Sequence, residues 1–554
     1  MYVKYFLVCL HPKSILYAFM QNRFRHFNYI AASFVALFLT SCEDFLSSIR
    51  NENTQEISTL LYNLNDLDVC INGAYGAFSS NSYFGSLQLS ELLGSDCVTS
   101  TSNTAVLPDF SAYNRENYFF GYNTNIMDYQ AGILLQWASF VGNNSNIVLK
   151  SIDEKLPKLK TKNDSLNADR LQGEALLLRA TIEFYNNYFV GKQYHLNTLD
   201  SLSTLYRKRP ILGFEDMAEP RKTVAQVYRF IISDLQRAQQ LLPEKFDRTI
   251  HPLVYQYRCK KDVATAMLAK VYFQSNKFDS ALIHINLLLG NELGISSKFP
   301  LSPSSSYANM FQITDKTNFQ TGNSSEIIMA LHGNSAFLPT IPSRWQGFQW
   351  TAFKNIQNGD LSQAKFRVVF DKTFIDNWLR GDTAKDVRYK QLIYITRNQG
   401  KEAPAGQWTS LKMAFPTANM MWLRASEFHL MRAEIYGHKN NANYALQELN
   451  LIRTRAGIAE IRATVSKETL LAEIIDERAR ELNLENVRRW DNLRLASLSD
   501  TEYAAYLPEP YKSGNIPLGN RSALMTETAL PWNAARLYCV IPNNEYIFNP
   551  ALNK

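Results

Sequence analysis

The sequence is poor in glycine and proline. It has 23 glycines and 19 prolines in 554 residues, whereas these two residues make up roughly 12% of an average protein. Tight turns draw on both residues, so a chain of many short strands is excluded. No run without polar residues reaches the roughly 18 residues that a membrane-spanning helix needs, which excludes a protein with several spans. Hydrophobic residues make up 46% of the chain, enough for a large core.

The chain also has little excess charge. Its 58 basic and 51 acidic residues give a formal net charge of +7. Four of the basic residues lie in segment 1–41, which has no acidic residue: Lys4, Lys13, Arg23 and Arg25. The rest of the chain is nearly balanced, so it lacks the basic surface of a nucleic-acid-binding protein. We expect no nucleic acid among its partners.

Motifs for metal binding and catalysis are missing. The cysteines form no Cys-x-x-Cys pair, and the histidines are scattered along the chain. HExxH, GxSxG, Walker and GxGxxG motifs do not occur. We therefore expect no metal, no cofactor and no catalytic residue. The cysteines that we expect to be ordinary buried thiols are Cys70, Cys97, Cys259 and Cys539.

Residues 1–41 have the layout of a secretory signal. The apolar run Ile30–Leu39 follows basic residues and is too short to span a bilayer. It leads into Leu39-Thr40-Ser41-Cys42, which resembles the bacterial lipobox, whose cysteine is acylated and becomes the first residue after cleavage. Two or more acyl chains anchor a protein durably, so we expect Cys42 to tie the mature chain to a membrane. The alternative is a plain signal peptide that happens to contain a cysteine. A signal of ordinary length begins at Met20, and we expect translation to start there.

Most of the mature chain has the period of amphipathic helices. Apolar residues from Leu171 to Phe189 and from Val224 to Leu242 step by three and four. Two later segments, Met267–Leu288 and Met431–Ile452, each place Ala, Tyr and Ala at the tetratricopeptide spacing. The sequence therefore predicts a mainly α fold: a tetratricopeptide-like helical repeat scaffold with helix pairs at about 171–290 and 421–456.

Four long stretches lack a helical period. They are Thr99–Asn125, Lys298–Ala352, Arg397–Pro416 and Leu507–Pro531. We predict that they form irregular loops that present the ligand-binding residues, because binding side chains commonly lie on loops held by a rigid scaffold. The tryptophans that fall in helical runs, and that we therefore expect in the core, are Trp137, Trp422 and Trp490.

Aromatic and amide side chains gather in two of these stretches. Exposed aromatic rings stack on the C–H faces of sugars, while arginine and asparagine side chains hydrogen-bond sugar hydroxyls. The composition therefore predicts a glycan platform; the alternative is that these rings only pack the loops onto the body. The candidate ligand-binding residues are Tyr113, Arg115, Asn117, Tyr118, Trp345 and Trp350.

The densest group of charges lies between Asp476 and Arg494. Glu477, Glu481 and Glu485 step by four along one helical face, and paired carboxylates can act as general acid and base. Neighbouring arginines would hold these acids ionised, so we interpret the group as structural ion pairs. A helical glycoside hydrolase is the alternative that this group leaves open.

Ordered motifs along the mature chain resemble the SusD/RagB family of bacterial surface nutrient-binding lipoproteins. The matching segments are Cys42–Leu46, Asp68–Ala77, Glu91–Asp96, Gly173–Gly191, Leu423–Glu427, Leu449–Gly457, Glu477–Arg494 and Val540–Pro550. One departure is Asn486, which stands where the family usually has glycine; asparagine also tolerates a left-handed backbone.

This resemblance implies one SusD-like domain over residues 42–554, anchored in the outer membrane and exposed at the cell surface. It also implies capture of an oligosaccharide and its delivery to a TonB-dependent, SusC-like outer-membrane transporter, without catalysis. We favour oligosaccharide over peptide because polar and aromatic loops suit sugars. The alternatives are a RagB-like peptide-binding lipoprotein and a scaffold that binds only protein.

Overall fold

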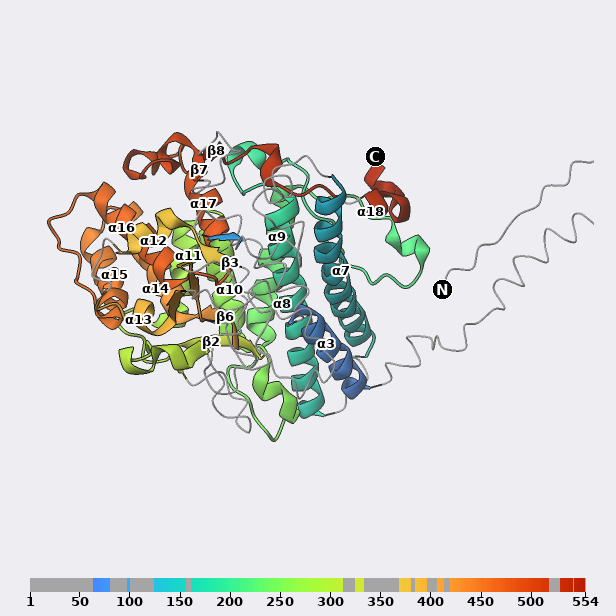
Figure 1. Ribbon diagram of the computed structural model, residues 1–554. Helices are drawn as coiled ribbons and strands as arrows, with labels where there is room; N and C mark the ends of the chain where they lie inside the picture. Colours follow the sequence, from blue (N-terminus) through green and yellow to red (C-terminus); the bar gives the residue numbers. More distant parts are fainter. Residues whose placement is uncertain are drawn as a thin grey trace, which may run out of the picture. The chain divides into compact units, whose positions relative to one another are not determined.

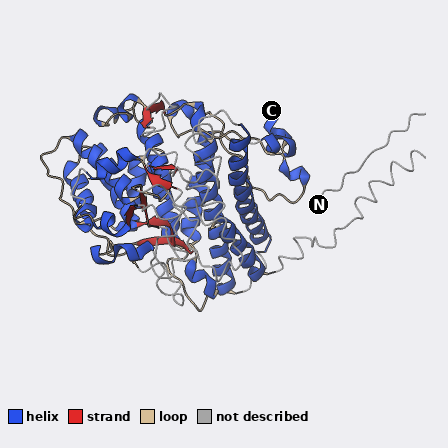
Figure 2. Ribbon diagram, viewed as in Figure 1, coloured by secondary structure: helices blue, strands red, loops and turns tan. Residues whose placement is uncertain are grey.

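The structure is a computed structural model that describes residues 63–79, 97–99, 124–155, 161–311, 324–332, 368–379, 384–395, 406–412, 419–517, 529–541 and 543–553. In this part the chain is mainly helical, as the sequence predicts, and its few strands are short (Figures 1 and 2). None of the described helices is both long and apolar enough to cross a bilayer.

Four helices pack side by side in the first half of the described chain (Figure 1). They are α3 (Leu64–Phe78), α7 (Thr124–Lys155), α8 (Lys162–Val190) and α9 (Val224–Leu241). Helix α8 packs against the other three and buries side chains around most of its circumference. Helix α9 begins with a capping box between Thr223 and Gln226 and ends just before Pro243.

The two predicted helix pairs are confirmed. The first is α10 (Lys261–Gln274) with α11 (Phe278–Leu289), and the second is α14 (Ala425–His438) with α15 (Ala442–Ala456). The alanines at the tetratricopeptide positions, where the helices of a pair approach, are fully buried: Ala269, Ala281, Ala433 and Ala445. Gly457 ends α15 with a left-handed backbone, φ 77°. The next helices are α16 (Lys467–Glu481) and α17 (Arg488–Ala496).

The described strands form four antiparallel pairs. These are β1 (Cys97–Thr99) with β3 (Val368–Phe370), β2 (Ile327–His332) with β6 (Asn419–Arg424), β4 (Ile393–Ile395) with β5 (Trp408–Ser410), and β7 (Asn515–Pro517) with β8 (Ala529–Pro531). The shorter elements are α12 (Lys372–Leu379), α13 (Val387–Leu392), α18 (Asn543–Phe548) and the 3₁₀ helices η4 (Leu196–Thr198), η5 (Phe214–Met217), η6 (Leu253–Tyr257), η7 (Ser304–Phe311), η9 (Ala504–Tyr506), η10 (Tyr511–Ser513), η11 (Ala535–Leu537) and η12 (Pro550–Asn553).

Two sequence-based expectations need correction here. Stretches predicted to be irregular contain strands β2, β5, β7 and β8 and the 3₁₀ helix η7. Trp422 is buried as expected but lies in strand β6, not in a helix. The longer strands β2 and β6 were missed because the runs Ile327–Leu331 and Met421–Leu423 are buried on both faces and show no alternation. Strands β5, β7 and β8 are three residues long, too short to show an alternation.

The remaining core expectations hold in part. Trp490 is buried and stacks on Tyr188 with ring centroids 4.0 Å apart, whereas Trp137 is only half-buried. Burial raises the pKa of Cys259 to about 12 and that of Cys70 to about 11. These cysteines are therefore protonated thiols; Cys259 is fully buried, but Cys70 is half-buried, as is Cys539.

Candidate functional site

The predicted ligand and lipid residues fall outside the described residues. This applies to Cys42, Tyr113, Arg115, Asn117, Tyr118, Trp345 and Trp350. Their roles therefore stay predictions. The structure does describe the elements from which the chain enters and leaves the two aromatic segments.

Both aromatic segments join one strand pair at the same end. Strand β1 ends at Thr99, and the segment that carries Tyr113 and Tyr118 follows it in the chain. Strand β3 begins at Val368, and the segment that carries Trp345 precedes it. Thr99 and Val368 are partners in the antiparallel register. The chain therefore leaves β1 towards the first segment opposite the point where it enters β3, sixteen residues after the second stretch ends at Ala352.

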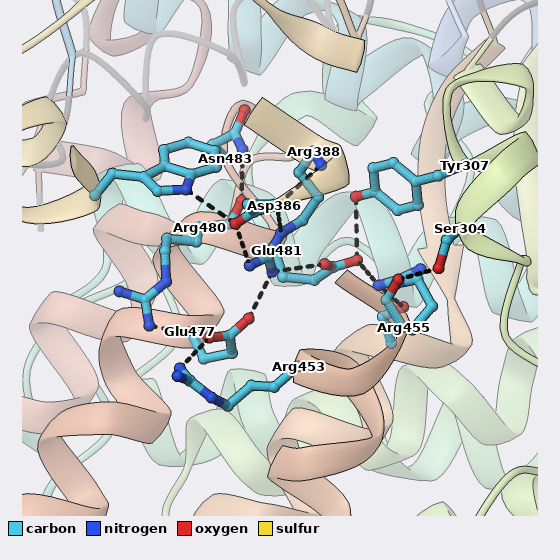
Figure 3. A network of polar contacts seen from close by, with 12 residues as sticks. Ser304, Tyr307, Asp386, Arg388, Arg453, Arg455, Glu477, Arg480, Glu481 and Asn483 are labelled. Carbon is cyan, nitrogen blue, oxygen red and sulfur yellow. Dashed lines mark hydrogen bonds and ion pairs between the residues drawn. The ribbon is translucent and has the colours of Figure 1, made fainter. Parts of the chain in front are cut away.

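The acidic cluster predicted from the sequence is the centre of a buried network of ion pairs (Figure 3). Glu481 on α16 has no exposed surface. Its Oε1 accepts hydrogen bonds from Nη1 of Arg424 at 2.6 Å and from Nη2 of Arg455 at 2.5 Å. The Tyr307 hydroxyl donates to the same oxygen at 3.2 Å, and Nη1 of Arg388 donates to Oε2 at 3.0 Å. Four donors from four elements thus surround one carboxylate.

Glu477, one helical turn earlier, is held in the same way. It is fully buried and accepts from Arg388 at 2.6 Å, Arg480 at 2.9 Å and Arg453 at 3.0 Å. Burial alone would raise the pKa of Glu477, but the charges of Arg388, Arg480 and Arg453 lower it to about 2. For Glu481 the neighbouring cations likewise outweigh burial and hold the pKa well below its usual range. Both groups are ionised at neutral pH, with no proton to donate.

The third acid of the predicted face, Glu485, is also engaged. Its oxygens accept from Nε of Arg424 at 2.7 Å and from Nζ of Lys412 at 2.6 Å. Burial lowers the pKa of Lys412 to about 8, against the opposing charges of Glu485 and Glu481. Lys412 also donates to the backbone carbonyl of Glu481 at 2.6 Å. It therefore satisfies the end of α16 and is not aimed at a ligand.

This network confirms the structural interpretation of the acidic cluster. A retaining or inverting glycosidase needs one carboxyl group that can give up a proton and a second that faces the substrate. Here each carboxylate is buried and saturated by arginine or lysine donors. Among the described residues, no group of three or more His, Cys, Asp or Glu side chains has metal-binding geometry either.

Sequence reasoning missed several members of this network, among them Asp386, Arg388 and Glu326. Nε and Nη2 of Arg388 bind Asp386 at 3.0 and 2.8 Å, and Nη1 links the pair to Glu477. Glu326, the residue before β2, accepts a hydrogen bond from Arg424 at 2.9 Å. Both partners come from segments far from α16 in the chain, so no local spacing signals them.

Further residues of the recognised motifs hold the scaffold together. Arg478 binds Asp491 through two hydrogen bonds of 3.0 Å, and Arg494 pairs with Glu434 at 2.7 Å. Asn486 has φ 62°, which confirms the left-handed backbone expected at this position. Buried ion pairs of the motifs between Leu423 and Arg494 therefore join α14, α16 and α17.

Two protein-family models match the chain. Residues 300–554 match a model described as the SusD family. Residues 86–273 match a model described as starch-binding associating with outer membrane. The two matches together extend over most of the region in which the motifs lie.

Individual relatives give a consistent result. The SusD-like protein P38 of Formosa agariphila is 21% identical over 352 residues, which cover 56% of this chain and 67% of that protein. A SusD superfamily protein from Bacteroides vulgatus has a similar structure, with a TM-score of 0.67 and 23% identity over 88% of this chain and 98% of its own. A SusD superfamily protein from Bacteroides thetaiotaomicron matches with a TM-score of 0.65 and 20% identity, over 88% of this chain and 99% of its own. These structures share the fold of the chain.

Proposed function

Because the chain belongs to the SusD superfamily, as its motifs predict, we propose that it is an outer-membrane lipoprotein that binds oligosaccharide. The observation that carries this proposal is the match of residues 86–273 to the family described as starch-binding associating with outer membrane. In the proposed cycle, Cys42 carries the lipid anchor, and the protein faces the cell exterior. It hands its ligand to a TonB-dependent, SusC-like transporter.

The ligand site that we propose consists of the two aromatic segments. Tyr113, Arg115, Asn117 and Tyr118 come from the first, and Trp345 and Trp350 from the second. The pairing of Thr99 with Val368 supports a joint site, since it brings together the ends of the described strands that lead to the two segments. The aromatic rings would stack on sugar faces, and the arginine and asparagine would hydrogen-bond hydroxyls.

A non-catalytic role is part of the proposal. Its support is the engagement of Glu477 and Glu481 in buried ion pairs, which removes the strongest candidates for an acid–base pair. A glycoside hydrolase would have to use carboxylates other than these. We therefore expect the protein to bind oligosaccharides and leave them uncleaved.

Calorimetric titration of the detergent-purified lipoprotein with a panel of neutral oligosaccharides tests this function. Maltoheptaose is the first probe, because the matched family is described as starch-binding. We expect binding within one glycan class and an unchanged ligand in chromatograms taken afterwards. Binding of a peptide mixture with no response to any glycan would replace the proposal by the peptide-binding alternative, and cleavage of the ligand would make the protein an enzyme.

A further inference from the structure

A narrow pocket, partly open to solvent, lies between α7, α8 and the segment Thr204–Ile211. Its volume is about 30 Å³, the room of roughly two water molecules, so only a small group such as a hydroxymethyl can enter it. It contains no residue of the two aromatic segments or of the ion-pair network. Its polar lining residues are Ser139, Asn143, Asn146, Glu183, Asn186, Thr204 and Arg207, and its other lining residues are Leu135, Ala138, Gly142, Leu205 and Ile211.

The wall formed by the segment Thr204–Ile211 is fixed by side-chain amides of α7. The Asn143 side chain accepts from the backbone N–H of Ile211 at 2.6 Å and donates to its carbonyl at 3.2 Å. The Asn146 amide donates to the carbonyls of Arg207 and Arg209 at 3.0 and 3.1 Å. The pocket is therefore preformed, as small-molecule sites usually are.

One acceptor atom in this pocket clearly lacks a donor. Oδ1 of Asn186 is buried, and no described residue donates a hydrogen bond to it. The Asn186 side chain is deeply buried, with its residue only 2% exposed. Glu183, one turn earlier on α8, faces the same side, and the Thr204 hydroxyl is the donor beside its carboxyl group. A buried acceptor without a donor is costly, so Oδ1 of Asn186 indicates that something else supplies a hydrogen-bond donor here.

The charges around the pocket and its apolar walls argue against a bound metal cation. The positive charges of Arg207 and Arg179 both act to lower the pKa of Glu183. Burial raises the pKa of Glu183 to about 7, and the Thr204 hydroxyl and these arginines counteract burial only in part. Leu135, Leu205 and other aliphatic side chains form much of the wall, whereas Ca²⁺ prefers six or more oxygen ligands. A neutral molecule with hydroxyl donors and C–H faces fits this lining better.

We propose that this pocket binds a neutral hydroxyl-rich group, such as the hydroxymethyl end of a pyranose, as a second carbohydrate subsite on the helical scaffold. A sugar hydroxyl donates to Oδ1 of Asn186. The C–H groups of the sugar pack against Leu135 and Leu205. The proposal takes only the class of ligand from the proposed function, since its residues are separate from the two aromatic segments.

Gly142 offers a way to fill the pocket without disturbing the helix. It lines the pocket, and a Cβ at this position would meet no atom within 4 Å. Replacing a helical glycine also favours the helix. Gly142→Leu should therefore occupy the pocket and keep the fold. Gly73→Leu is the matched control, because Gly73 is an exposed helical glycine on α3 with equally free space around its Cβ.

The test uses methyl α-D-glucopyranoside as the probe and saturation-transfer NMR as the readout. All variants carry Trp345→Ala and Trp350→Ala, which remove the proposed loop site. We expect probe binding to persist in this background, to be lost with Gly142→Leu and to be kept with Gly73→Leu. Equal binding in both glycine variants would overturn the proposal, and so would the lack of any probe binding, which would mean that the pocket holds ordered water only.

A second variant tests the proposal independently, in case Gly142→Leu does not fold. Asn186→Leu has nearly the same volume and removes the unsatisfied acceptor, so it should fold at least as well as the parent. It should lose the probe signal, and a retained signal would contradict the proposal. The two proposals can fail separately. If no oligosaccharide of the panel binds, but the glucoside signal is present and is lost with Gly142→Leu, the proposed function is refuted and the subsite is supported.

Discussion

Thr99 and Val368 lie opposite each other in the antiparallel pair of β1 and β3. They are more than two hundred residues apart in the sequence. Thr99 begins the first stretch in which aromatic and amide side chains gather, and Val368 follows the end of the second, Ala352, by sixteen residues. This pairing brings together the ends of the described strands that lead to the two segments. It supports our proposal that Tyr118 and Trp345 belong to one ligand site.

Removing the charge of Glu477 should destabilise the fold. Glu477→Gln leaves Arg388, Arg480 and Arg453 facing a neutral amide in a buried site, and breaking such a pair costs roughly 3–5 kcal/mol. Denaturant unfolding measures this loss. The control is Glu473→Gln on the same helix, whose carboxylate is one-third exposed and lies 3.6 Å or more from its partners; we expect an effect below about 1 kcal/mol there. Lower ligand affinity at unchanged stability would instead place Glu477 in the binding site.

Glu477 should also make the stability of the protein depend on pH in the acid range. The pKa of Glu477 is about 2 in the folded protein, against 4.5 for the free side chain. Its contribution to stability is therefore fully present above pH 4.5 and is lost as the pH falls towards 2. The unfolding free energy of the parent should fall across this interval more steeply than that of Glu477→Gln. Parallel curves for the two proteins would contradict this assignment.

The contribution of Glu183 to stability should change with pH in the opposite direction to that of Glu477. Burial raises its pKa from 4.5 to about 7, so its contribution is fully present below pH 4.5 and is lost as the pH rises towards 7. The loss amounts to roughly 3 kcal/mol at most, from the size of the shift. Glu183→Gln should remove this decline and make the protein more stable than the parent at pH 8. Glu154→Gln, at an exposed position of α7, is the control and should leave the decline in place.

Membrane attachment should depend on Cys42. Cys42→Ala removes the sulfur that would carry the acyl chains, so the variant should leave the membrane fraction or accumulate unprocessed. Metabolic labelling with a fatty acid, followed by fractionation, measures both outcomes. Labelling and membrane recovery equal to those of the parent would mean that Cys42 is not the anchor.

The local signals in the sequence predicted the parts of the fold that depend on local interactions. Gly457 marks a helix end because its left-handed backbone suits glycine, and the buried Ala269 and Ala445 mark the close approach of paired helices. Arg388 and Glu326 could not be foreseen, because their partners are brought together only by the tertiary fold. Strands β1 and β3 are three residues long, too short for any period to show.

Some residues of the candidate site could likewise be predicted from the sequence, and others could not. The composition of the sequence indicates the aromatic segments, and the arginines next to Glu477 and Glu481 in the sequence predict that these carboxylates form structural ion pairs. The pocket at Glu183 and Asn186 was not foreseen. Its residues look like an ordinary amphipathic helix in the sequence, and its unsatisfied acceptor is defined by what surrounds it in three dimensions.

The central claim is that both aromatic segments form one oligosaccharide site. The most direct measurement is a double-mutant cycle of Tyr118→Ala and Trp345→Ala, titrated calorimetrically with the glycan that the parent binds. Each substitution should weaken binding by roughly 1–3 kcal/mol, the scale of ring stacking, with little change in melting temperature. The two effects should be non-additive by about 0.5 kcal/mol or more, as for residues that share a ligand. Unchanged affinity in both single variants, or strictly additive losses, would contradict a joint site.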